Sequence, residues 1–268
     1  MPAEAQRVRV AVDGHVAIVT LARPERHNAL DLAMFDGIRA AAEQVAGEPG
    51  VRAVVLHGDG ASFCSGLDIQ SIIGELGIEA FVAWVRGDGG SPNRAQRAGH
   101  DWLALPIPVI AAVHGACFGG GLQIALGADI RIAAPDARLS VMEVRWGLIP
   151  DMSITRTLPR LVASDVAREL TYTGRVLDGD EAHRVGLVTK LADDPLAAAL
   201  ALADEIAQRS PEAVRAAKRL YEQSWAGERG ATLALEAELQ LALLGSPNQL
   251  EAVAAGLERR EPRFTDPR

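Results

Sequence analysis

The sequence is poor in the residues from which several kinds of protein are built. It has two cysteines, Cys64 and Cys117, and neither lies in a C-x-x-C pair or a Cys/His array with zinc spacing. A disulfide framework and a metal site are therefore not expected, and both thiols are predicted to be small core residues. Only two lysines, Lys190 and Lys218, occur among 27 basic residues, a bias that fits a GC-rich bacterial genome.

Long apolar runs and an excess of positive charge are also missing. No run of about 18 uncharged apolar residues could span a bilayer, and the first 22 residues lack the apolar region of a signal peptide. We expect a cytoplasmic protein with no membrane partner. The formal net charge of -8 opposes nonspecific nucleic-acid binding, which needs a basic face. No nucleic-acid partner is expected.

The residues that are present indicate a globular α/β protein. The chain has 268 residues, of which 49% are hydrophobic, enough for a substantial core. Helical patterns at 31–47 and 120–127 alternate with short β-branched runs, which predict strands at 8–12, 16–22, 51–58, 108–115, 129–134 and 186–192. The stretch 70–104 is rich in glycine and charge and is predicted to be a mobile loop flanked by short helices.

The composition changes at Pro195, after which Ala, Leu, Glu and Arg recur at helical spacing. We divide the chain into a core of residues 1–195 with the functional site and a helical region of residues 196–268. The leucines of 233–244 would be exposed on an isolated hairpin. Burial of these leucines against another subunit is therefore expected, as in a homo-oligomer.

Two similar loops carry the first functional signal. "GASFCSGLDI" at 60–69 and "GACFGGGLQI" at 115–124 each follow a predicted strand. Glycines at these points could let two backbone N–H groups converge on one ligand oxygen, as in an oxyanion hole. Tight helix packing is the alternative explanation of the glycine triplet, because glycine in a helix costs about 1 kcal/mol relative to alanine.

At these residues the chain resembles the enoyl-CoA hydratase/isomerase family, the crotonases. The matching segments are "RPERHNAL" at 23–30, "SFCSGLDI" at 62–69, "HGACFGGGLQIALGADIRIA" at 114–133, "SVMEVRWGLIPD" at 140–151, "TGRVLDGDEAHRVGLV" at 173–188 and "LERREPRF" at 257–264. The resemblance implies a spiral of ββα repeats with C-terminal helices that assemble trimers or hexamers. It also implies an acyl-CoA substrate, with coenzyme A as part of the substrate and no separate cofactor.

The same resemblance assigns the binding residues. Ser65 and Gly120 match the two positions whose backbone N–H groups hold the thioester oxygen, and Arg26 matches a basic position near the CoA phosphates. A solvated turn residue is the alternative for Arg26, and a helix N-cap is the alternative for Asp68. The candidate CoA-contacting segment and acyl-tunnel residues are Ser65, Gly66, Leu67, Asp68, Ile69, Met142 and Trp146.

Three residues are candidates for acid–base chemistry. Glu143 lies in a local apolar stretch, where desolvation is expected to raise the pKa of its carboxyl. By resemblance it matches one of two glutamates that hold water in crotonase hydration, but Gln123 occupies the position of the other. Asp151 follows Glu143 by eight residues, a spacing similar to that of the dienoyl-CoA isomerase branch. A turn or cap residue is the alternative for Asp151.

These assignments imply an enoyl-CoA hydratase/isomerase that stabilises a thioester enolate. Because Gln123 cannot exchange a proton at working pH, two-glutamate hydration is in question. The alternatives are an enoyl- or dienoyl-CoA double-bond isomerase that uses Glu143 with Asp151, and a noncatalytic acyl-CoA-binding homologue.

Overall fold

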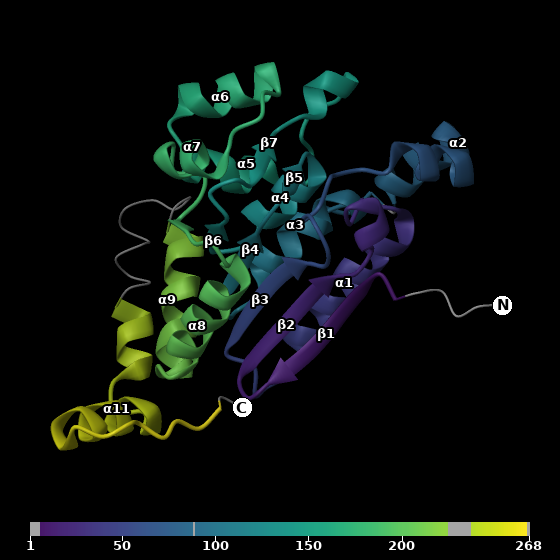
Figure 1. The fold of residues 1–268 in the computed structure, drawn as a ribbon. Helices are drawn as coiled ribbons and strands as arrows, with labels where there is room; N and C mark the ends of the chain where they lie inside the picture. Colours follow the sequence, from purple (N-terminus) through teal and green to yellow (C-terminus); the bar gives the residue numbers. More distant parts are fainter. Residues whose placement is uncertain (1–5, 88, 225–236, 267–268) are drawn as a thin grey trace.

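A six-stranded sheet forms the centre of the protein (Figure 1). The structure is a computed structural model that describes residues 6–87, 89–224 and 237–266. Strand β1 is antiparallel to β2 and the other neighbours are parallel, in the order β1 (Val8–Asp13), β2 (Val16–Leu21), β3 (Ala53–Gly58), β4 (Val109–Val113), β6 (Ile130–Ala133) and β8 (Lys190–Leu191). A second, parallel sheet pairs β5 (Ala116–Phe118) with β7 (Arg138–Ser140).

The α/β class and all six predicted strand runs are confirmed, although the run at 186–192 contributes only the two residues of β8. The three-residue strands β5 and β7 were not predicted. Three residues are too few to show the alternation of apolar and polar side chains by which a strand is recognised.

Both faces of the main sheet are covered, which explains the continuous apolar sequence of β4, "VIAAV". Successive side chains of a strand point to opposite faces. Accordingly, Ala53 and Val55 pack against helix α8 (Pro195–Ala207), whereas Val54 and Leu56 face the larger core. That core also holds apolar side chains of α1 (Leu32–Ala46), α3 (Arg94–Ala104) and α4 (Gly120–Leu126).

The prediction of a loop flanked by short helices over 70–104 is confirmed, although the helices occupy most of that stretch. Helix α2 (Ile69–Arg86) begins at Asp68, whose side chain accepts a hydrogen bond from the Ser71 N–H, and α3 begins with a capping box at Asn93. The irregular part is confined to the segment between them. Trp102, on the apolar face of α3, is fully buried.

The remaining short elements lie between β2 and α1 and between β7 and β8. They are η1 (Pro24–Arg26), η2 (Glu143–Trp146), α5 (Ile154–Thr157), η3 (Leu158–Arg160), α6 (Ser164–Thr173) and α7 (Gly179–Arg184). The fold thus repeats two strands followed by a helix, as in β1–β2–α1 and β4–β5–α4, the arrangement expected of the ββα spiral.

The change of composition at Pro195 coincides with the start of α8, but this helix covers the main sheet. The division into residues 1–195 and 196–268 remains a prediction. After α8 come α9 (Pro211–Ser224) and α11 (Pro247–Glu258), which lies apart from the sheet in Figure 1.

The leucine-rich segment at 233–244 is described only from residue 237, and residues 237–243 are helical. Leu241 and Leu244 are exposed there, as are Leu250 and Leu257 on α11. Within the described ranges, no helix combines the length and apolar character needed to cross a membrane.

Candidate active site

Three segments that are distant in the sequence lie side by side and form the floor of the site. The backbone of Cys64 forms a parallel β-bridge with that of Cys117 on β5, and Cys117 pairs in turn with Leu139 on β7. At the end of this ladder, the Gly119 N–H donates a 2.9 Å hydrogen bond to the carbonyl of Ser140. The pairing brings the 60–69 loop, the glycine triplet and the start of η2 together.

At each of the three glycines a side chain would be unfavourable. Gly119 has a φ of +52°, in the left-handed region, and a Cβ there would lie 3.3 Å from Glu143 Oε1. A Cβ on Gly120 would approach Leu30 Cδ1 to 2.8 Å, and one on Gly121 would clash with the carbonyl oxygen of Cys64. Close packing therefore explains Gly121, while Gly119 and Gly120 border the cavity itself.

A cavity of about 270 Å³ opens above this floor. It collects most of the residues that were predicted to bind substrate, namely Ser65, Gly66, Leu67, Ile69, Gly120, Met142 and Trp146. Both candidate carboxyl groups, Glu143 and Asp151, also line it. The rest of its wall is mainly apolar, and such a cavity with few polar groups is typical of small-molecule sites.

A wider outer groove of about 840 Å³ adjoins the cavity and shares Ser65, Leu67, Ile69 and Trp146 with it. Arg26 and Asp68 line the groove. Arg26 is half exposed, which agrees with the alternative that it is a solvated turn residue. Its guanidinium also lies 3.5 Å from the Asp68 carboxylate. Trp146 is 65% exposed at the junction of the two hollows.

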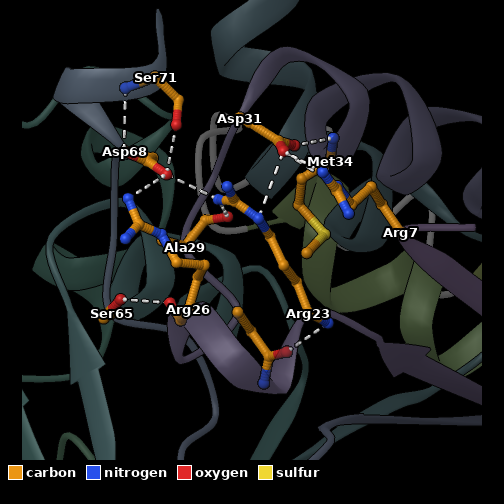
Figure 2. Close-up of polar contacts among 10 residues, drawn as sticks. Arg7, Arg23, Arg26, Ala29, Asp31, Met34, Ser65, Asp68 and Ser71 are labelled. Carbon is orange, nitrogen blue, oxygen red and sulfur yellow. Dashed lines mark hydrogen bonds and ion pairs between the residues drawn. The ribbon is translucent and has the colours of Figure 1, made fainter. Parts of the chain in front are cut away.

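Figure 2 shows the Asp68 carboxylate between the guanidinium groups of Arg23 and Arg26. Arg23 is buried, donates to Asp68 at 2.8 Å and to the Ala29 carbonyl at 3.0 Å, and lies 3.4 Å from Asp31. Burial disfavours the charged form of Asp68, but hydrogen bonds from Ser71 and Arg23 outweigh it and lower its pKa to about 2. Asp68 is therefore a helix cap and the centre of an ion-pair network.

The backbone geometry argues against the Ser65 N–H as an oxyanion donor. This N–H donates to the His27 carbonyl at 3.0 Å. The neighbouring loop residues are held by the hydrogen bonds from Leu30 N–H to Gly66 O and from Asp68 N–H to Leu30 O, which leave the Leu67 N–H between them. Across residues 6–87, 89–224 and 237–266, neither the Leu67 nor the Gly120 N–H has a hydrogen-bond partner.

Glu143 begins η2 and has the environment of an acid–base group. Burial raises the pKa of its carboxyl, and the nearby charge of Asp151 raises it further, against hydrogen bonds from its own backbone and from Gln123. Its Oε2 atom is buried and has no hydrogen-bond partner in the described part of the chain. The direction of the pKa shift agrees with the expectation from the sequence.

Gln123, on α4, is 2% exposed and lies behind the cavity wall. Its Nε2 donates to Glu143 Oε1 at 2.6 Å, and its Oε1 accepts from the Met152 N–H at 2.8 Å. The amide is thus bound to the protein on both sides. It does not line the cavity itself.

Asp151 lies between η2 and α5 on the cavity wall. The residue is exposed overall, yet partial burial of its carboxyl raises the pKa above the ordinary value. Its side chain does not cap α5, which begins at Ser153 without a side-chain cap. A second carboxyl therefore shares the cavity with Glu143.

Four further cavity residues were not predicted from the sequence: Phe35, Phe81, Val85 and Ala95. Three of these four residues belong to α2 and α3, the helices that flank the predicted loop. The apolar positions Phe81 and Val85, four residues apart, are the helical signal that could have identified them. Trp84 packs behind this wall, with its ring 5.1 Å from that of Phe35.

Known proteins share this architecture over almost the whole chain. The crystal structure of enoyl-CoA hydratase from Bacillus anthracis matches with a TM-score of 0.89 and 30% identity, covering 97% of this chain and 99% of that one. The corresponding values for enoyl-CoA hydratase from Mycobacterium tuberculosis H37Rv are 0.84, 32%, 97% and 99%. The mitochondrial Delta(3,5)-Delta(2,4)-dienoyl-CoA isomerase of Mus musculus is 33% identical over 260 residues, 93% of this chain and 78% of the relative.

These likenesses and the repeated ββα units define a crotonase fold. The family model described as enoyl-CoA hydratase/isomerase matches residues 12–267. The chain therefore belongs to the enoyl-CoA hydratase/isomerase family, whose substrates are acyl-CoA thioesters.

Proposed function

We propose that this enzyme is an enoyl-CoA double-bond isomerase, in which Glu143, together with Asp151, moves a proton between two carbons of the acyl chain. The observation that carries the proposal is the polar content of the cavity. Two carboxyl groups with raised pKa values line it, while the Gln123 amide is bound to the protein behind its wall.

The reaction needs only these groups and an oxyanion hole. A carboxylate removes a proton from C2 of a 3-enoyl thioester, and the electron pair moves into the thioester carbonyl to give a dienolate. The carboxyl then returns a proton at C4, so that the double bond moves from C3–C4 to C2–C3. Atoms and charge balance without water or any co-reactant.

The Leu67 and Gly120 N–H groups are the proposed donors to the enolate oxygen. Both border the cavity and neither is engaged within the described chain. One donor of this kind stabilises a transition state by roughly 3 to 4 kcal/mol in other enzymes. This proposal replaces Ser65, whose N–H is bonded to His27, with Leu67.

Hydration of a 2-enoyl-CoA is the second candidate, favoured by the names of the two solved structures. In the two-glutamate form of that reaction, one carboxylate activates water and the other protonates C2. An amide cannot supply either step. Asp151 would have to supply the proton-transfer step that the Gln123 amide cannot supply.

One spectroscopic experiment separates the candidates. The enzyme is incubated with 3-hexenoyl-CoA and with crotonyl-CoA, and the absorbance of the conjugated enoyl thioester is followed. An increase with the first substrate and little change with the second are expected. Rapid loss of crotonyl-CoA absorbance without isomerase activity would overturn the proposal in favour of hydration, and binding without turnover of either would favour the noncatalytic homologue.

The exposed leucines of the C-terminal region support a second proposal, that the chain forms homotrimers or hexamers. Light scattering is expected to give a mass three or six times that of the chain. A monodisperse monomer at micromolar concentration would contradict it.

A further inference from the structure

The orientation of the Gln123 amide is fixed by its two neighbours. The Met152 N–H can only donate, so the atom 2.8 Å from it must be the carbonyl oxygen of the amide. The amide nitrogen therefore faces Glu143 and donates to Oε1 at 2.6 Å. A buried side chain with both ends engaged has little freedom to rotate.

As a consequence, the two oxygens of the Glu143 carboxyl have different surroundings. Oε1 accepts the Gln123 N–H and lies close to Gly119, whereas Oε2 is buried without a partner in the described residues. A proton on Oε1 would face an N–H donor, so the neutral acid is favoured with its proton on Oε2.

We infer that Gln123 is a positioning residue, which fixes the Glu143 carboxyl through Oε1 and stabilises its ionised form. The inference rests on the proposed function for its catalytic consequence, but the contact itself concerns the unliganded protein. In the reaction, the carboxyl held in this way would take up the C2 proton and return it at C4 or exchange it with Asp151.

A glutamate at position 123 would act differently. One of its oxygens could still accept from the Met152 N–H, but the other would face the Glu143 carboxylate. Two adjacent carboxylates resist ionising together, so they would share one proton and titrate as a pair. With an amide there, Asp151 is the other titratable group whose charge acts on Glu143.

The test compares Gln123→Glu and Gln123→Met with the wild-type enzyme. Carbon-13 NMR of glutamate-labelled, unliganded protein gives the titration midpoint of Glu143, assigned by its loss in Glu143→Gln. The amide N–H stabilises the ionised carboxylate, so each variant should raise the midpoint by about one pH unit or more. Gln123→Glu keeps the acceptor for Met152, and thus remains informative where Gln123→Met does not fold.

Gln249→Glu is the matched control. Gln249 also accepts from a backbone N–H, that of Gly245 at 3.0 Å, but it lies on α11. The same substitution there adds the same charge and should leave the Glu143 midpoint unchanged.

Kinetics on 3-hexenoyl-CoA provide the second readout. In Gln123→Glu, kcat should fall by about 10-fold or more, the pH limb of kcat/KM should move upward with the midpoint, and KM should change little. Unchanged midpoints in both variants would overturn the inference. Shifted midpoints with no wild-type turnover would support the Gln123 contact and overturn the proposed function.

Discussion

Glu143 in the cavity and Asp68 in the adjoining groove are both shielded acids, but their surroundings shift the pKa values of their carboxyls in opposite directions. Desolvation is the first influence on both and favours the neutral form. Around Asp68, the hydrogen bonds of Ser71 and Arg23 outweigh it. Around Glu143, the hydrogen bonds from its own backbone and from the Gln123 amide do not, and the charge of Asp151 adds to the effect of burial.

The difference shows what each region is suited to do. A carboxylate that stays ionised next to arginines holds loops together, because its charge is constant at ordinary pH. A carboxyl with a raised pKa can gain and lose a proton near the operating pH, as general acid–base catalysis requires. The groove therefore contains a carboxylate of constant charge, Asp68, whereas the cavity contains the carboxyl suited to the proposed proton transfer, Glu143.

The largest effect is expected where the cavity loses its acid. Glu143→Gln is nearly isosteric and keeps an acceptor for Gln123, so the fold and acyl-CoA binding should survive. Isomerase turnover should fall by about 100- to 10,000-fold, the range for a lost general acid–base group. Turnover and calorimetric acyl-CoA affinity measure the two properties, and near-wild-type turnover would contradict the assignment.

The stability of the ion-pair network around Asp68 should depend on its buried cation, Arg23. Arg23→Met leaves Asp31 and Asp68 without their shared partner, and breaking a buried ion pair lowers the free energy of unfolding by about 3 kcal/mol or more. Arg26→Met is the matched control: its 50% exposed side chain should contribute less than about 1 kcal/mol. Urea unfolding measures both, and equal losses would show that the network does not depend on burial.

The pH dependence of the free energy of unfolding should show the contribution of the Asp68 carboxylate. Its pKa is lowered from 3.8 to about 2 on folding, so its ionised form stabilises the protein above pH 3.8. This contribution, on the order of 2 kcal/mol, should be lost as the pH falls toward 2. The difference in unfolding free energy between wild type and Asp68→Asn should shrink over that window. A constant difference would mean that folding does not change the pKa of Asp68.

Asp151→Asn should have the smallest effect of these changes. Loss of the neighbouring negative charge should lower the pKa of Glu143 and shift the pH limb of kcat/KM downward. A fall in kcat of about 10-fold is expected if Asp151 receives or returns a proton. A shifted limb with unchanged kcat would restrict Asp151 to an electrostatic role.

The alternation of strands and helices could be predicted from the sequence, because side-chain periodicity is a local property. The sequence also located the two glycine loops, and the apolar surroundings of Glu143 were enough to predict the direction of its pKa shift. The resemblance then supplied the candidate positions. In the stretch 70–104 the sequence indicated a loop between two helices, but not how long those helices are, because the glycines of the short connection dominate the composition there.

Which groups are available for chemistry depends on contacts that form when the chain folds. Whether a backbone N–H is free depends on its partners: His27 engages that of Ser65, while the fold leaves that of Leu67 unpaired within the described residues. The role of Gln123 likewise depends on Met152 and Glu143, which are 29 and 20 residues away. Hydrogen bonds between distant segments leave no periodic trace in the sequence, because they are created when the chain folds and brings those segments together.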